Sequence, residues 1–392
     1  MYYFEFPKID ATIYEGSVTS SINTGLDQIL EINKNMNSAG TTIDVSRVLI
    51  QFDYSYISSS VQSGIIPSDA KYYLNLYDAS STELAVEQTL FAYMISGSWN
   101  GGTGTKDRDP TISDGASWKY RDNDTTKTQW VSGSDTQGGT WYTSSLNSGF
   151  NVSASVDLVY ETKDIRMDVT SLVKNHIYSG STFPNYGFIL KRENVPTSQS
   201  LHSIFDPTLA TGSAEHDTSH QGNLKFFSRE TNTIFPPKLE VEWDDSSWNT
   251  GSLSALSATD LDRLKVYFQN LKPEYKEKSK VKFRVVGREL YPTRGFDTTP
   301  AALTVKYLPS GSRLLQHGTY YSIQDSSTGE TIVPFSTGSI VSCDTQGNFF
   351  NVDMNAFQPE RYYKFEVKVI SGSGTDQTSL VYDDGYEFKV VR

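Results

Sequence analysis

A lone cysteine, Cys343, is the first constraint that this 392-residue sequence sets, because no disulfide can form within the chain. Secreted β-proteins of this size often carry disulfides, so the lone cysteine favours folding in a reducing compartment. The sequence also lacks an apolar run of about 18 residues, the length that a membrane-spanning helix needs. Its first residues, MYYFEFPKIDATIYEG, show no basic segment followed by an apolar stretch. We therefore expect no signal peptide and folding in a cytoplasm.

Concentrated positive charge is missing as well. The formal net charge is −12 and no Lys/Arg-rich run occurs, which argues against a nucleic-acid partner because phosphate binding needs clustered cations. No GxSxG surrounds a usable serine, and Cys343 has no histidine beside it in the sequence. None of the 46 Asp and Glu residues stands out as a pair for glycoside hydrolysis. We predict that the protein is not an enzyme, has no catalytic residues and binds no cofactor.

The residues that are abundant favour β-structure. Aromatic residues make up 13% of the chain, with 24 Tyr and 20 Phe, while hydrophobic residues as a whole make up 37%. Such a composition, with many Ser, Thr and Gly residues, is typical of short strands joined by polar turns. Residues 45–54 alternate as a strand does, with Val48 and Ile50 on one face and Arg47 and Leu49 on the other. The sequence therefore predicts an all-β fold.

Two β-sandwiches account for the pattern along the chain. We predict a jelly-roll-like sandwich over residues 1–246, with a polar insertion at 119–155 that has little apolar periodicity. Residues 247–255 have the small, polar composition of a linker. An immunoglobulin-like sandwich is predicted over 256–392, with a long excursion near 290–335.

One short helix is predicted near residues 171–178 (SLVKNHIY). Leu172, Val173 and Ile177 can face inward at helical spacing, and a Ser or Thr residue is expected to cap the first turn.

Four segments in order resemble the DNRLRE-type β-sandwich family of bacterial surface proteins. They are residues 46–53 (SRVLIQFD), 99–122 (beginning WNGGTGT), 168–190 (DVTSLVKNHIYSGSTFPNYGFIL) and 226–243 (FFSRETNTIFPPKLEVEW). The resemblance covers about residues 40–246 and implies a β-sandwich that serves adhesion or scaffolding, with no shared catalytic site. Asn100 stands where the pattern has an acidic residue, and His176 stands where it has a tryptophan.

Two groups of side chains have the residue types of metal ligands. Aspartates that could hold Ca²⁺ bracket the tryptophan motif: Asp107, Asp109, Asp114, Asp122 and Asp124. They lack the spacing of an EF-hand loop, and turn formation is the favoured interpretation. His216 and His220, in the segment EHDTSH, are four residues apart but lie in loop-like sequence without a defined third zinc ligand. A solvated loop is the favoured interpretation there.

The tryptophans divide into two pairs. Trp99 and Trp118 are framework positions in the resemblance and are expected to be buried. Trp130 and Trp141 lie in the polar insertion, where little core is expected, and with Tyr142 they are the candidates for contact with a partner. A protein partner is favoured over local packing or a glycan.

Surface proteins are exported, whereas a tailed-phage protein is made and assembled in the host cytoplasm. The expected cytoplasmic folding and the serial sandwiches therefore indicate a structural protein of a tailed-phage virion. Residues 271–291 also resemble strands of immunoglobulin-like domains in phage structural proteins. We expect a neck or tail ring component or a fibre adaptor, which binds other virion proteins and copies of itself but neither nucleic acid nor membrane. The alternatives are a head decoration or fibre protein, a bacterial adhesion or carbohydrate-binding module, and a polysaccharide depolymerase.

Overall fold

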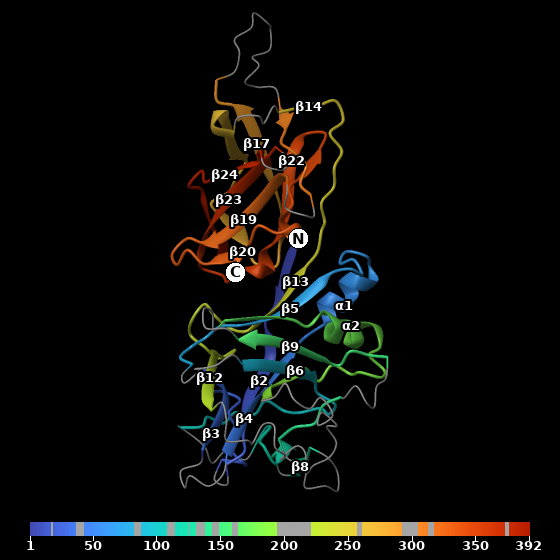
Figure 1. Ribbon diagram of the computed structural model, residues 1–392, viewed down its shortest axis with the longest axis vertical. Helices are drawn as coiled ribbons and strands as arrows, with labels where there is room; N and C mark the ends of the chain where they lie inside the picture. The colour runs from blue at the N-terminus through green and yellow to red at the C-terminus, as the bar shows by residue number, and fades with distance from the viewer. Residues whose placement is uncertain are drawn as a thin grey trace, which may run out of the picture. The chain divides into compact units, whose positions relative to one another are not determined.

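The chain forms two compact units. The larger unit is Glu5–Glu240, and the smaller unit joins Met1–Phe4 to Val241–Arg392. The computed structural model describes the following residues: 1–16, 19–36, 43–81, 88–107, 114–124, 126–130, 138–142, 149–158, 164–193, 221–256, 261–291, 305–312, 317–372 and 376–392. Strands dominate both units, so the all-β prediction is confirmed (Figure 1).

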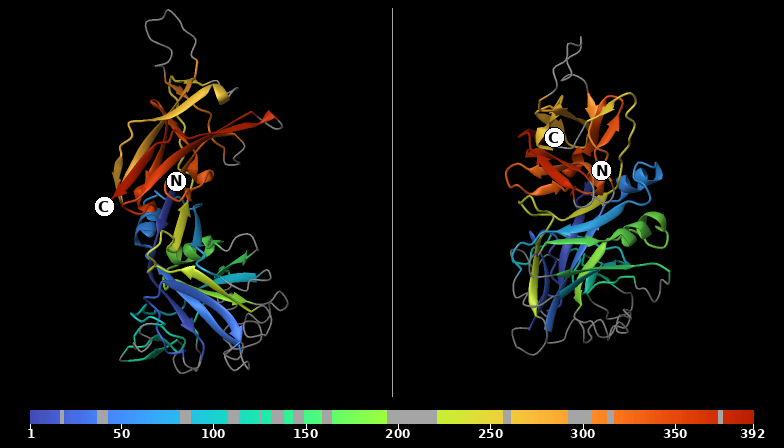
Figure 2. Two further views of the ribbon diagram at one scale, coloured as in Figure 1. Left: turned by 90° about the vertical axis from the view of Figure 1, so that its left-hand side faces the viewer. Right: turned by 45° about the horizontal axis from the view of Figure 1, so that its top comes forward.

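The larger unit contains two sheets of a sandwich and two short helices (Figure 2). The elements up to the insertion are β1 (Tyr2–Glu5), β2 (Pro7–Tyr14), β3 (Ile29–Met36), β4 (Ile43–Phe52), α1 (Ser55–Gln62), β5 (Lys71–Leu76) and β6 (Gln88–Met94). The remaining elements are β7 (Tyr120–Asp122), β8 (Thr128–Gln129), β9 (Ser153–Leu158), β10 (Ile165–Asp168), α2 (Thr170–Tyr178), β11 (Phe188–Glu193), β12 (Gly222–Phe227) and β13 (Lys238–Glu242). The chain passes between the units within β1 and β13.

The order of the strands is that of a jelly roll. One sheet runs β1-β13-β5-β10, and the other contains β4-β11-β6-β9. Along the chain these eight strands alternate between the sheets except at β6 and β9, which pair within one sheet, and this is the order of the two Greek keys of a jelly roll. Three further strands extend the second sheet: β3 and β12 continue it beyond β4, and β2 also pairs with β4. The jelly-roll prediction is thus confirmed by topology.

Both faces of the larger sheet are covered. The cross-strand pairs Phe188↔Ile50 and Ile189↔Leu49 point to opposite faces, and all four side chains are fully buried. One face is the interior of the sandwich. The other face, which carries Leu49 and Ile189, packs against side chains from the stretch between β6 and β9. This stretch begins before the predicted bounds of 119–155 and is called the insertion from here on. The insertion therefore acts as a third layer over the sheet.

The predicted helix is present as α2, and Leu172 and Val173 are buried as expected. Its predicted Ser or Thr cap is wrong, because the N-cap residue is Val169 and Thr170 Oγ1 accepts a hydrogen bond from the Tyr72 amide (3.0 Å). The Asp168 carboxylate accepts a hydrogen bond from the Thr170 amide (2.9 Å) at the start of the helix. A second helix, α1, was not predicted; the carboxylate of Asp53 accepts a hydrogen bond from the Ser55 amide at its start. Neither helix, in the part of the chain that the structure describes, is long and apolar enough to cross a membrane.

The smaller unit has the two-sheet topology of an immunoglobulin-like domain, as predicted. Its elements up to the middle are β14 (Ser254–Ala255), a 3-10 turn (Leu261–Arg263), β15 (Leu264–Gln269), β16 (Glu274–Lys276), β17 (Lys280–Glu289), β18 (Lys306–Tyr307), β19 (Gly318–Asp325) and β20 (Thr331–Val333). The others are 3-10 turns at Thr337–Ser339 and Met354–Ala356, β21 (Ser342–Asp344), β22 (Gly347–Asp353), β23 (Tyr362–Ser371), β24 (Thr378–Tyr382) and β25 (Glu387–Val391). One sheet contains β15-β17-β22-β21 and the other β25-β23-β19-β20, which match the two sheets of that fold.

A tyrosine at the start of β23 fixes the corner that leads into this strand. The hydroxyl of Tyr363 donates to the Gln358 carbonyl (3.1 Å) and accepts from the Gln358 amide (2.9 Å). This is the tyrosine corner of immunoglobulin-like sandwiches. The core beneath it is rich in aromatic side chains, among them Phe283, Phe350 and Phe365.

The expected boundaries differ from the observed units in three respects. Met1–Phe4 belong to the smaller unit, because Tyr2 and Phe4 pack in its core. The predicted excursion near 290–335 contains regular sheet strands from residue 318 onward, β19 and β20, so in that part the prediction is wrong. In the predicted insertion at 119–155, the described residues form the small β7–β8 sheet and the first part of β9.

Candidate functional site

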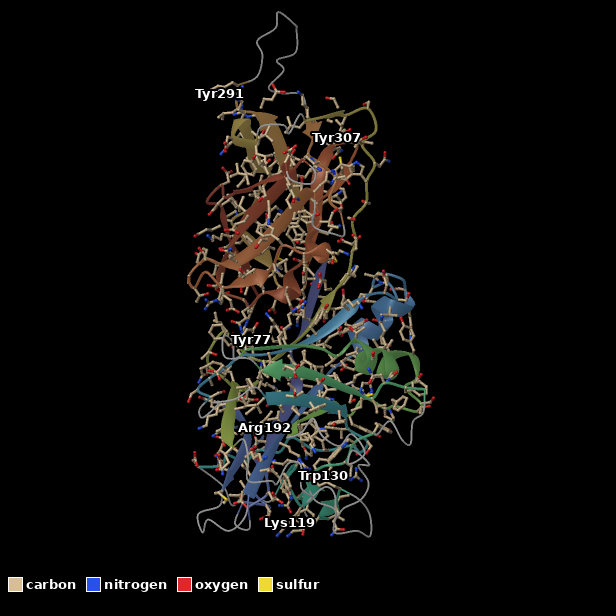
Figure 3. The ribbon with its side chains drawn as sticks, in the orientation of Figure 1. Tyr77, Lys119, Trp130, Arg192, Tyr291 and Tyr307 are labelled. Carbon is tan, nitrogen blue, oxygen red and sulfur yellow. The ribbon has the colours of Figure 1, made fainter. Side chains whose placement is uncertain are left out.

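The four tryptophans of the larger unit form one buried cluster. Trp99, Trp118, Trp130 and Trp141 pack with Leu49 and Ile189 on the outer face of the sheet. Trp130 and Trp141 are each only 5% exposed, and the Trp130 indole donates a hydrogen bond to the Ser117 carbonyl (2.9 Å) (Figure 3). The premise that these two rings have little core to join is therefore wrong. Buried rings cannot offer their faces to a partner or a sugar.

A fully buried arginine shares this cluster. The guanidinium of Arg47 lies over the rings of Trp118 (4.6 Å to the centroid) and Trp141 (5.2 Å) and donates to the Gly138 carbonyl. Cation–π contacts gain strength when they are desolvated. The alternation of residues 45–54 placed Arg47 on the second face of its strand, and the insertion is what buries that face.

A buried asparagine holds the start of the insertion. Asn23 donates to the carbonyls of Gly101 (2.7 Å) and Ala116 (2.9 Å) and accepts from the Gly104 amide (2.8 Å). A Cβ atom at Gly102, whose φ is +78°, would lie 2.4 Å from the Asn23 side-chain oxygen. A Cβ at Gly104 would lie 2.5 Å from the Asn23 carbonyl oxygen, so the close approach of Asn23 requires glycine at both positions. Asn23 lies far from the motif in the sequence, and no pattern around it predicts this role.

Tyr142, the third candidate for a partner contact, is half-buried. Its ring packs edge-on against Phe183 (5.0 Å between centroids), and its hydroxyl donates to the Thr182 carbonyl (3.2 Å). Burial raises the pKa of this hydroxyl above its usual value. These contacts assign Tyr142 a packing role, and its prediction as an interface residue stays untested.

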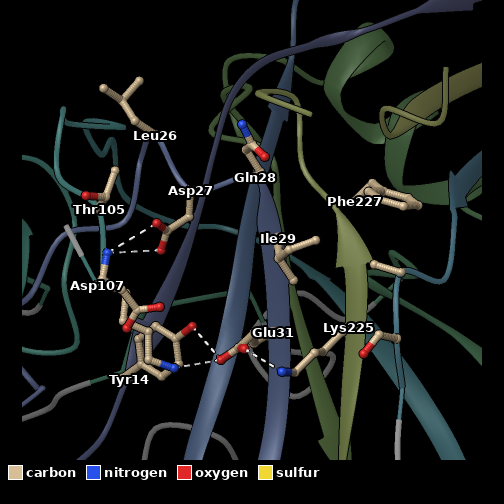
Figure 4. A pocket seen from close by; sticks show the side chains of 13 residues that line it. Tyr14, Leu26, Asp27, Gln28, Ile29, Glu31, Thr105, Asp107, Lys225 and Phe227 are labelled. Carbon is tan, nitrogen blue, oxygen red and sulfur yellow. Dashed lines mark hydrogen bonds and ion pairs between the residues drawn. The ribbon is translucent and has the colours of Figure 1, made fainter. Parts of the chain in front are cut away.

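The larger unit also has a pocket of about 480 Å³ (Figure 4). Its lining residues come from separate parts of the sequence: Tyr14, Leu26–Ile29, Glu31, Ala79, Ser80, Thr105–Asp107, Lys225 and Phe227. Small-molecule sites in proteins have volumes in this range. We take this pocket as the candidate functional site.

The register of β3 and β12 forms the floor of the pocket. Ile29 lies directly opposite Phe227, and Glu31 lies opposite Lys225, so all four side chains share one face of the sheet. The floor therefore has an apolar half beside a charged half. Leu26, 44% exposed, adds apolar surface above it.

Glu31 is the centre of the charged half. It accepts hydrogen bonds from the Tyr14 hydroxyl (2.8 Å) and the Lys106 ammonium (2.8 Å) and forms an ion pair with Lys225 (3.3 Å). Burial acts to raise the pKa of Glu31, but these donors outweigh it and lower the pKa below its usual value. Lys106 also lies over the Tyr14 ring, 4.1 Å from its centroid. Glu31 is thus held as a carboxylate by fixed partners.

The carboxylates of Asp27 and Asp107 have fewer hydrogen-bond partners than that of Glu31. Both oxygens of Asp27 share a single donor, the Lys106 backbone amide, at 3.2 Å each. Burial raises the pKa of Asp27 to about 6, and the charge of Asp107 adds to this effect. Asp107 itself is exposed, and its carboxylate has no hydrogen-bond or ion-pair partner among the described residues. Both carboxylates therefore have acceptor capacity left for a ligand.

The metal candidates are only partly within the described chain. Asp107 lines the pocket, whereas Asp109, His216 and His220 lie outside the described residues, so their roles stay predictions. The Asp114 carboxylate accepts from the Thr103 amide (3.1 Å) and hydroxyl (2.6 Å) as a turn residue does. Across the described ranges, no three Asp, Glu, His or Cys side chains gather as a metal site would require.

Comparisons with known proteins leave the family of the chain open. No family model matches the sequence, and no curated protein matches it. Among solved structures, a DUF4785 family protein from Legionella pneumophila aligns with 8% identity and a TM-score of 0.18. The alignment covers 97% of this chain and 65% of the Legionella chain. A likeness this distant bears on neither the fold nor the function of the protein.

Proposed function

We propose that this protein is a non-enzymatic structural component of a tailed-phage virion, a neck or tail ring protein or a fibre adaptor. It acts by binding other virion proteins and copies of itself. The proposal rests on the resemblance of residues 40–246 to scaffolding sandwiches and on the tandem arrangement of jelly-roll and immunoglobulin-like folds. Because a fold hosts many functions, the surfaces of the two units must supply further support.

The observation that supports it best is a contrast in aromatic exposure. The tryptophans of the larger unit are buried, whereas Tyr291 is 80% exposed at the end of β17, beside the half-exposed Leu290 (Figure 3). Exposed aromatic and aliphatic side chains together are typical of protein–protein contacts. They lie at the start of the excursion that the sequence predicts near 290–335. We assign the contact with a partner to this end of β17.

The state of Cys343 agrees with assembly in a host cytoplasm. Its thiol is buried, and burial raises its pKa to about 11. A thiol in this state reacts slowly and suits a small core residue in a reducing compartment.

The experiment is a complementation of particle assembly. Particles from a phage that encodes the protein would be purified on a density gradient and analysed by quantitative mass spectrometry. We expect the chain at a fixed ratio to the tail proteins. Tyr291→Ser should reduce its incorporation at least tenfold, while Tyr178→Ser, an equally simple change at an exposed tyrosine of the larger unit, should not.

Two results would overturn the proposal. Absence of the chain from purified particles, with recovery at the bacterial surface, would favour an adhesion module. Release of new reducing ends from host polysaccharide by the purified protein would favour a depolymerase.

A further inference from the structure

The pocket between β3, β12 and the segment Thr105–Asp107 contains charges of both signs, which limits the net charge that a ligand can carry. Asp27, Glu31 and Asp107 are acidic, and Lys106 and Lys225 are basic. A permanent anion would lie beside three carboxylates, and a permanent cation beside two ammonium groups. A neutral ligand whose groups both donate and accept hydrogen bonds avoids both conflicts.

The free hydrogen-bonding capacity of the pocket suits hydroxyl groups. Asp27 and Asp107 can each accept further donors, and the ammonium groups of Lys106 and Lys225 have protons beyond those that face Glu31. The exposed Gln28 side chain adds an amide, which both donates and accepts. Adjacent hydroxyls of one ligand can bridge the two oxygens of a carboxylate, as paired donors do.

The apolar half of the floor suits a ring with C–H groups on one face. Phe227 and Ile29 lie opposite each other on neighbouring strands, and Phe227 also makes a stacked contact with Phe235 (6.0 Å between centroids). A ring that already packs against a neighbour loses less side-chain freedom when a ligand binds.

We propose that this pocket binds a neutral saccharide residue, whose hydroxyls bond to Asp27 and Asp107 while its C–H face packs on Phe227 and Ile29. The inference goes beyond the assembly role and does not rest on it. It also places sugar recognition away from the tryptophans, which are buried. A single ring in an open pocket is expected to bind with a dissociation constant of the order of 1 mM.

The test is saturation-transfer NMR on the full chain. The probes are the methyl glycosides of glucose, galactose, mannose and N-acetylglucosamine, with N-acetylneuraminic acid as the anionic sugar and glucosamine as the cationic one. We expect saturation transfer to at least one neutral glycoside and weaker transfer to both charged sugars. Asp27→Asn should weaken binding about tenfold, because the amide retains one acceptor for Lys106 but loses the second oxygen.

Two further variants keep the result decisive. Asp107→Asn should also weaken binding, and it cannot be dismissed as a folding defect because this exposed carboxylate has no partner among the described residues. Asp262→Asn changes an exposed aspartate of the smaller unit and should bind as the parent does. The proposal is overturned if no neutral glycoside binds when its concentration is about ten times the expected dissociation constant. It is equally overturned if a charged sugar binds best, or if binding survives both pocket substitutions. Particle incorporation is measured separately, so either proposal can fail alone.

Discussion

Replacing Trp130 by alanine distinguishes a framework residue from an interface residue. The side chain is buried against the outer face of the sheet, and its indole nitrogen bonds to the Ser117 carbonyl. A buried tryptophan removes about 150–250 Å² from water, worth up to about 4–6 kcal/mol at ~25 cal/mol per Å². Measured Trp→Ala costs in cores are about 3–5 kcal/mol, and the lost hydrogen bond falls within that range. We expect Trp130→Ala to destabilise the larger unit by about 4 kcal/mol.

Urea unfolding followed by circular dichroism would measure this loss, with thermal unfolding as a second probe. For a unit of this size, about 4 kcal/mol corresponds to a fall in the melting temperature of roughly 10 °C. Trp248→Ala is the matched control, because Trp248 is 38% exposed and its ring packs edge-on against Tyr307 (5.9 Å between centroids). We expect it to cost less than about 1 kcal/mol.

The result that would refute this reasoning is specific. If the free energy of unfolding of Trp130→Ala lies within about 0.5 kcal/mol of that of the parent, the Trp130 ring does not hold the insertion against the sheet. If the same variant also no longer self-associates, the result would support the interface role that the sequence predicts for Trp130.

Three further outcomes follow from single side chains. Tyr363→Phe removes both hydrogen bonds to Gln358 and should lower the free energy of unfolding of the smaller unit by about 1–2 kcal/mol, measured by urea titration. An unchanged urea midpoint would show that the tyrosine corner does not stabilise this unit. Burial lowers the pKa of His176 to about 4, with its hydrogen bond to Phe183 acting in the opposite direction. The unfolded state therefore binds a proton first as the pH falls, and about 3 kcal/mol of stability, complete above pH 6.5, should be lost between pH 6.5 and 4. The stability difference between the parent and His176→Phe isolates this change from other titrating groups, and a pH-independent difference would contradict it. Cys343 should react with a thiol reagent only as fast as the chain unfolds. Rapid labelling in native buffer would show that the thiol is accessible in the folded protein.

The fold could be predicted from the sequence because strand alternation is local. The alternation at residues 45–54 and the helix near 171–178 both correspond to elements of the structure. The burial of the second face of β4, which carries Arg47 and Leu49, could not be predicted in this way. Its cover is an irregular layer with no period of its own, held by contacts such as Trp99 to the Tyr186 carbonyl (2.8 Å). These contacts join residues distant in sequence, and composition alone made the layer look like a polar excursion.

The pocket escaped prediction for a related reason. Asp107 was noted as a calcium candidate, yet Asp27, Glu31 and Lys225 carry no motif and are separated by up to about half the chain. Only the register of β12 against β3 places Lys225 opposite Glu31. A shift of β12 by one residue would turn Lys225 to the face opposite Glu31, so no local pattern could reveal the site.

The floor of the pocket and the tryptophan layer lie on different strands. The floor lies on β3 and β12, and Tyr14 ends β2, none of which belongs to the eight strands of the jelly roll. The tryptophan layer covers β4, β6 and β11, which do belong to it, and also packs on Ala11 and Ile13 of β2. Substitutions at Asp27 or Asp107 should therefore change binding while the melting temperature stays within a few degrees of the parent, whereas Trp130→Ala should do the reverse. If the pocket substitutions instead unfold the larger unit, the carboxylates serve the framework and the pocket has no ligand of its own.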